Sequence, residues 1–188
     1  AGYEKLGGSV GALAKRIEEI YTELDDDGRE LIRQMFLRLV TLGEGVEDTR
    51  RRVLRSELLA IGEHPDLAED IIDTYTASRL LSVDHDPATR SPMVELAHEA
   101  ILREWERLRG WLDESRGDIR LQRALASAAS EWQTGGKDRS YLLRGMRLDQ
   151  FEQWSGDTQL ALTAKEREYL RASLAERERE ATEEAARQ

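Results

Sequence analysis

The stretch LLSVDHDPATRSPMVELAHEAILREW, residues 80–105, changes its hydrophobic period near its middle. Two short apolar runs, residues 80–84 and 93–97, flank a segment that contains two prolines, which predicts a β-hairpin. Beyond His98 the apolar side chains recur every three or four residues, which predicts a helix over residues 99–114. His98 therefore lies where a strand gives way to a helix.

The segments before this hairpin alternate between helical spacing and short breaks. The expected elements are a loop over residues 1–10, a helix over 10–24 that stops at residues 25–28, a helix over 31–40 that ends before Gly43, a short strand over 50–54, a short helix capped by Ser56, and a helix from Asp66. Over residues 25–98 the order is helix, short strand, helix, helix, strand, turn, strand. That is the order of a winged-helix domain, a three-helix bundle closed by a small hairpin.

The remainder of the chain, residues 99–188, is predicted to be helical throughout. The expected elements are the helix over 99–114, a second with Leu121 to Trp132 on one face, a third over 140–154, and a last one that starts at Thr163 with Glu166 in a capping box. Past Leu174 the last helix is too polar to bury a face, so we expect it to project, fray or continue into a further segment. The fold class is mainly α: a linker helix over 1–24, a winged helix over 25–98 and a helical bundle or arm over 99–188.

The composition limits the classes of function. The 188 residues are 39% hydrophobic and 35% charged, with a net charge of −10, which disfavours non-specific binding of nucleic acid. The absence of cysteine excludes disulfides and thiolate chemistry and fits a reducing compartment. No apolar run approaches the length of a membrane span, so we expect a cytoplasmic protein with no membrane partner. Because the chain opens without Met, we interpret it as a piece of a longer parent protein.

Catalytic and metal motifs are not found. The glycines of GGSVG, residues 7–11, lack the Lys-Ser or Lys-Thr of a phosphate-binding loop. In HEAIL, Leu102 stands where a zinc-protease helix needs its second histidine, and His85 between two aspartates fits a solvated turn. We therefore expect no catalytic residue, no metal and no cofactor in this chain, and no enzyme activity of its own.

One basic cluster, RRRVLR, contains Arg50, Arg51, Arg52 and Arg55. Winged helices often bind DNA, so these side chains are candidates for holding a phosphate backbone. They could equally neutralise nearby acids such as Glu44, Glu47 and Asp48. The helix that would read DNA, PDLAEDIIDTYTASR, has four acidic residues and one basic residue, so nucleic acid is not the expected partner.

Four segments together resemble a known family. They are FLRLV at 36–40, TRRRV at 49–53, LAHEAILREWERLRGWLDE at 96–114 and YLLRGMRL at 141–148. They are similar to the region that follows the nucleotide-binding core in bacterial STAND-type signalling NTPases, which often carry WD repeats at their C-terminal end. GGSVGAL is more loosely similar to the segment before the winged helix in related ATPases.

The resemblance implies a role for His98. In such families a winged-helix histidine in a Met-His-Asp-like motif touches the β-phosphate of ADP and helps to hold the core shut. Here the motif is Ala97-His98-Glu99, so alanine replaces methionine and glutamate replaces aspartate. The alternative is a junction histidine that is satisfied by Glu95, Glu99 or the backbone.

The resemblance also implies a function for the whole chain. It would be a non-catalytic regulatory module that couples the ADP or ATP state of an upstream nucleotide-binding domain to downstream sensor repeats. ADP or ATP with Mg would bind to the parent protein, and the activated parent could form an oligomer. The alternatives are a winged-helix DNA-binding regulator and a protein-interaction scaffold.

Overall fold

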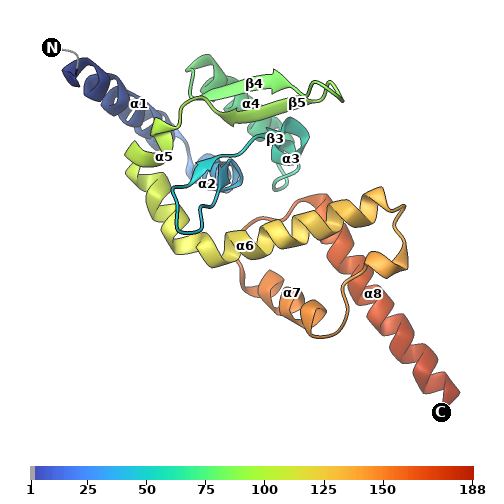
Figure 1. The fold of residues 1–188 in the computed structure, drawn as a ribbon. Helices are drawn as coiled ribbons and strands as arrows, with labels where there is room; N and C mark the ends of the chain where they lie inside the picture. Colours follow the sequence, from blue (N-terminus) through green and yellow to red (C-terminus); the bar gives the residue numbers. More distant parts are fainter. Residues whose placement is uncertain (1–2) are drawn as a thin grey trace. The chain divides into compact units, whose positions relative to one another are not determined.

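The computed structural model describes the backbone of residues 3–188 and the side chains from residue 11 onward. This part of the chain is mainly helical, with eight α-helices, one short 3₁₀ helix and two small antiparallel sheets (Figure 1). It divides into two compact units, unit 1 over residues 1–116 and unit 2 over residues 117–188. The boundary between the units falls inside a helix. The functional division at residues 24 and 98 stays a prediction.

Unit 1 combines helices with both sheets. Its elements are α1 (Tyr3–Glu23), α2 (Asp26–Arg38), β1 (Val40–Thr41), β2 (Thr49–Arg50), β3 (Val53–Leu54), α3 (Arg55–Leu59), α4 (Pro65–Ala77), β4 (Leu81–His85), β5 (Pro92–Leu96), α5 (Ala100–Glu104) and the first part of α6 (Glu106–Thr134). Strands β1 and β2 form one antiparallel pair, and the second sheet has the order β3-β5-β4. In that sheet Val94 lies opposite both Val53 and Val83, so the hairpin predicted around residues 85–92 is present.

The core of unit 1 forms around α2. Asp25 caps this helix by accepting a hydrogen bond from the Gly28 N–H at 2.8 Å. Residues 25–28, which were predicted to stop the first helix, therefore form the start of α2. Phe36 is fully buried, and its ring meets that of Tyr75 edge to face at 5.7 Å between centroids. Helix α2 and helix α4 are therefore joined through their aromatic residues.

Several local predictions for unit 1 are wrong. Helix α1 starts at Tyr3, so residues 3–10 of the predicted loop are helical, and residues 1–2 of that loop lie outside the described residues. A glycine inside a helix costs only about 1 kcal/mol, which lowers helix propensity without forbidding a helix. The strand predicted over 50–54 is divided into β2 and β3. The N-cap position of α3 is Leu54, which makes no side-chain capping hydrogen bond, and not Ser56.

The helix predicted over residues 99–114 is also interrupted. Trp105 has an extended backbone, with φ −84° and ψ 97°, and separates α5 from α6. Helix α6 then runs without a break to Thr134, through Gly110 and Gly117, where the predicted pattern had two helices. At this break the Trp105 side chain is buried and donates its indole N–H to Glu18.

Unit 2 is a bundle made of the second part of α6, the 3₁₀ helix η1 (Arg139–Tyr141), α7 (Gly145–Asp157) and α8 (Ala164–Arg187). The helix predicted over 140–154 starts only at Gly145, which has φ +56°, a value that glycine adopts without strain. The predicted capping box is confirmed: Thr163 accepts from the Glu166 N–H, and the Glu166 carboxylate accepts from the Thr163 N–H. All side chains from Ala181 onward are exposed, yet α8 remains helical to Arg187.

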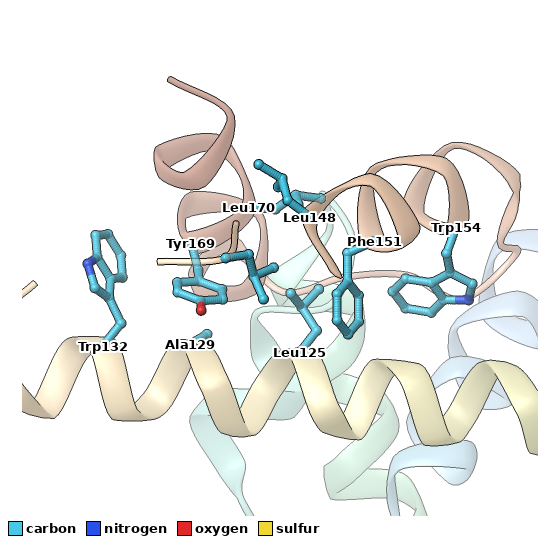
Figure 2. Close-up of a cluster of buried hydrophobic side chains, with 9 residues drawn as sticks. Leu125, Ala129, Trp132, Leu148, Phe151, Trp154, Tyr169 and Leu170 are labelled. Carbon is cyan, nitrogen blue, oxygen red and sulfur yellow. The ribbon is translucent and has the colours of Figure 1, made fainter. Parts of the chain in front are cut away.

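The core of unit 2 consists of apolar side chains from α6, α7 and α8, with Leu143 from the segment between η1 and α7 (Figure 2). Leu125, Ala129 and Trp132 point from α6 toward Phe151 of α7 and Tyr169 of α8. The residues of this cluster are Leu125, Ala129, Trp132, Leu143, Leu148, Phe151, Trp154, Tyr169 and Leu170. Four aromatic residues, Trp132, Phe151, Trp154 and Tyr169, therefore contribute to the core of this bundle, whereas Trp105 and Trp111 pack in unit 1.

Candidate functional site

His98 lies between the end of β5 and the start of α5, as the change of period predicts. Its side chain is exposed. Its backbone carbonyl accepts a hydrogen bond from the Ile101 N–H at 3.2 Å, at the first turn of α5. Within the described part of the chain, no hydrogen bond joins the imidazole to Glu95, Glu99 or any other residue. Both ring nitrogens are therefore available to an external group.

Arg50 contacts the residues on both sides of His98. From β2, its Nη1 donates to the Leu96 carbonyl at 3.0 Å, and its Nε donates to the Glu99 carboxylate at 3.3 Å. One guanidinium thus holds the backbone two residues before the histidine and the side chain one residue after it. The structure brings together Arg50 and His98, two candidates that the sequence placed in different sites.

The other arginines of the basic cluster are occupied within the chain. Their partners are the Arg38 carbonyl and Glu57 for Arg51, the His85 carbonyl and Asp84 for Arg52, and Glu69 and Asp73 for Arg55. The acids that neutralise the cluster are therefore mostly distant in sequence and are not Glu44, Glu47 or Asp48. The expectation that Glu44, Glu47 or Asp48 neutralise the cluster was wrong, because the fold, and not proximity in sequence, decides which charges meet.

Asp48 instead pairs with Arg116, the last residue of unit 1. The two carboxylate oxygens accept from Arg116 Nη1 at 3.0 Å and Nη2 at 2.6 Å, and one of them also accepts from the Gly43 N–H at 2.8 Å. The hydrogen bond from Arg116 is the main reason why the pKa of Asp48 lies below its usual value. Gly43 is required here, because a Cβ at this position would lie 2.2 Å from the Val46 carbonyl oxygen.

A second carboxylate connects α1 to the region of the helix break. Glu18 accepts from the Trp105 indole N–H at 2.7 Å and from Arg107 Nε at 3.0 Å. The pKa of Glu18 is lowered, chiefly by its hydrogen bond from Arg107. The Arg107 guanidinium also lies 4.4 Å from the centre of the Tyr21 ring. Sequence reasoning missed both pairings because the partners are 68 and at least 87 residues away.

The Asp48 pair makes unit 1 sensitive to acid. A carboxyl group with a lowered folded pKa stabilises the fold above its unfolded pKa, near 4, and this contribution is lost as the pH falls through the folded pKa. We expect Asp48→Asn to unfold at lower urea concentration than the native chain at pH 7, with the difference shrinking below about pH 4. Urea titrations at several pH values measure it. A difference that grows in acid would contradict the assignment.

Two further properties of the described residues bear on the site. No helix among them is long and apolar enough to cross a membrane. No group of three or more histidine, aspartate or glutamate side chains among them is arranged to hold a metal ion.

Comparison with known proteins gives one match. The family model described as Novel STAND NTPase 1 matches residues 1–140. Neither the curated proteins nor the solved structures include a match to this chain. The matched range covers α1 to α5, the junction at His98, all of α6 and the first two residues of η1, and thus most of the sequence. The chain belongs to the Novel STAND NTPase 1 family.

Proposed function

We propose that this chain is a non-catalytic regulatory module of a signal-transduction NTPase. It would couple the ADP or ATP state of a nucleotide-binding domain earlier in the parent protein to sensor repeats, such as WD repeats, later in it. In this proposal residues 25–98 act as a winged-helix domain. The membership in a STAND NTPase family supports it, as does the order of α2, α3, α4, β4 and β5.

The proposed contact with nucleotide is made by His98. An exposed imidazole with no partner in the described part of the chain can donate an N–H to a phosphate oxygen of ADP. A hydrogen bond to a charged group contributes about 1.5–3 kcal/mol. That is enough to shift an equilibrium between two states by about tenfold or more. The exposed, unbonded ring at a junction that Arg50 holds in place is the observation that carries the proposal.

The transmission from this contact cannot follow one straight helix. The helix predicted over residues 99–114, which would continue directly from the His98 junction, is interrupted at Trp105. Helix α1 is fastened to the same region, since Glu18 binds both Trp105 and Arg107. In our proposal a movement of α1 or of the junction shifts α5 and the start of α6 as a body.

The DNA-binding alternative gains no support from the basic cluster. Arg50, Arg51, Arg52 and Arg55 each lie within 3.4 Å of an acid of the same chain. Binding to DNA phosphates would have to break these ion pairs, which removes part of the gain from the new contacts. We therefore place this alternative behind the regulatory module, and the scaffold alternative has no specific observation in its favour.

The test is the retention of ADP by the purified parent protein. His98→Ala is expected to release ADP at least about tenfold faster than the native protein, because the phosphate loses a hydrogen-bond donor. His85→Ala is the matched control, since His85 is also exposed but lies at the far end of β4. Equal release by native protein and His98→Ala, with the fold intact by circular dichroism, would contradict the proposal.

A further inference from the structure

We propose that residues 48–50 are a tie that positions His98 and connects its junction to α6 beyond the break at Trp105. Arg50 is then a positioning residue for His98, and Asp48 transmits the position of the junction to Arg116. This inference rests on the proposed role of His98 for its functional meaning. Its structural part concerns this chain alone and is tested separately.

The first end of the tie is the guanidinium of Arg50. It donates in two directions, to the Leu96 carbonyl at 3.0 Å and to the Glu99 carboxylate at 3.3 Å. Because the guanidinium is rigid and planar, it fixes these two acceptors relative to each other. His98 lies between them in the chain, so the backbone that carries the imidazole is restrained on both sides. A lysine has no such planar fork and can replace only part of this restraint.

The second end of the tie is the carboxylate of Asp48. Its side chain is only 15% exposed and binds Arg116 through both oxygens. Such two-point pairs are directional as well as strong, so they fix orientation and not only distance. The Gly43 N–H holds the same carboxylate at 2.8 Å, which restrains the loop before β2. Along the chain, Arg116 follows Trp105 and lies on α6, whereas His98 precedes Trp105.

The segment between the two ends is held in extended form. Thr49 and Arg50 pair with Thr41 and Val40 in the β1–β2 sheet, and the next residue, Arg51, donates its N–H to the Leu39 carbonyl at 2.8 Å. Two residues of strand span about 7 Å, so the two ends are separated by a short and stiff path. The tie therefore gives a connection from His98 to α6 that does not pass through the extended residue Trp105.

The three histidines of the chain allow a direct test by NMR of their imidazole signals. Arg50→Ala is expected to shift the His98 signals and to leave those of His64 and His85 in place. Arg52→Ala is the matched control, because Arg52 contacts the His85 carbonyl and Asp84. It is expected to shift His85 and to leave His98 in place. Arg50→Lys is expected to give a smaller shift of His98 than Arg50→Ala, and it replaces that variant if the alanine variant unfolds.

The connection to α6 is tested from its other end. Asp48→Asn is expected to shift the His98 signals as well, although Asp48 does not contact His98. Asp73→Asn is the control, since Asp73 is an exposed partner of Arg55. Unchanged His98 signals in the Arg50 variants would overturn the positioning role. A shift in Arg50→Ala with none in Asp48→Asn would overturn the connection to α6.

Retention of ADP by the parent protein separates this inference from the proposed function. If His98→Ala and Arg50→Ala release ADP faster than the native protein, while Arg52→Ala does not, the proposed function and the positioning role are both supported. If His98→Ala releases ADP and Arg50→Ala behaves as native, the positioning role fails and the proposed function remains. If His98→Ala behaves as native, the proposed function fails, and the NMR comparison still decides whether the tie exists.

Discussion

Trp105→Ala is expected to lower the free energy of unfolding of unit 1 by about 3–5 kcal/mol, the usual cost of removing a buried tryptophan or phenylalanine side chain. Trp105 is 2% exposed, and its ring meets those of Phe36 and Trp111 edge to face, each at 5.3 Å between centroids. The substitution also removes the indole N–H that Glu18 accepts. It thus combines a cavity with a lost hydrogen bond at the point where α1 meets α5 and α6.

Hydrogen exchange read by mass spectrometry measures this effect segment by segment. Amides of α1 and α5 are expected to exchange faster in Trp105→Ala than in the native chain. Trp105→Phe keeps most of the ring and loses the N–H, so its exchange rates should lie between those of the native chain and those of Trp105→Ala. Glu104→Ala, at the exposed neighbouring position, is expected to stay within about 0.5 kcal/mol of native. If Trp105→Ala exchanges at the native rates, this aromatic cluster does not hold the helices together.

Phe151→Ala is expected to cost unit 2 a similar amount, about 3–5 kcal/mol. Phe151 is 2% exposed, and its ring meets that of Trp154 edge to face at 6.0 Å. Figure 2 shows it directed from α7 toward α6, between Leu125 and Trp154. Its removal leaves a cavity in the apolar cluster of unit 2, and the other buried residues of α7 are Leu148 and Trp154.

Tryptophan fluorescence and hydrogen exchange of α7 follow this change. The matched control is Gln150→Ala, which removes an exposed side chain one position earlier and is expected to leave stability within about 0.5 kcal/mol of native. If the two variants unfold at the same urea concentration, α7 is not held by Phe151. The bundle would then depend on the Trp132 and Tyr169 end of the cluster.

The sequence determined the features whose cause is local. The hairpin around residues 85–92 follows from two apolar runs and the prolines between them, and the capping box at Thr163 follows from one residue pair three positions apart. The position of His98 between strand and helix follows from a change of period. The mainly helical fold and the membership in a STAND NTPase family were likewise predicted, because both depend on patterns that are contiguous in the chain.

Only the tertiary structure decided which charges meet and where helices break. Arg50 was a candidate for DNA, yet its partners are Leu96 and Glu99, 46 and 49 residues later. The break at Trp105 lies inside a regular helical pattern, and it accompanies a hydrogen bond to Glu18, 87 residues earlier. Periodicity records which face of an element is apolar, but it carries no information on which distant side chain lies opposite. Ion pairs, and the backbone conformations that depend on them, are therefore fixed only when the chain has folded.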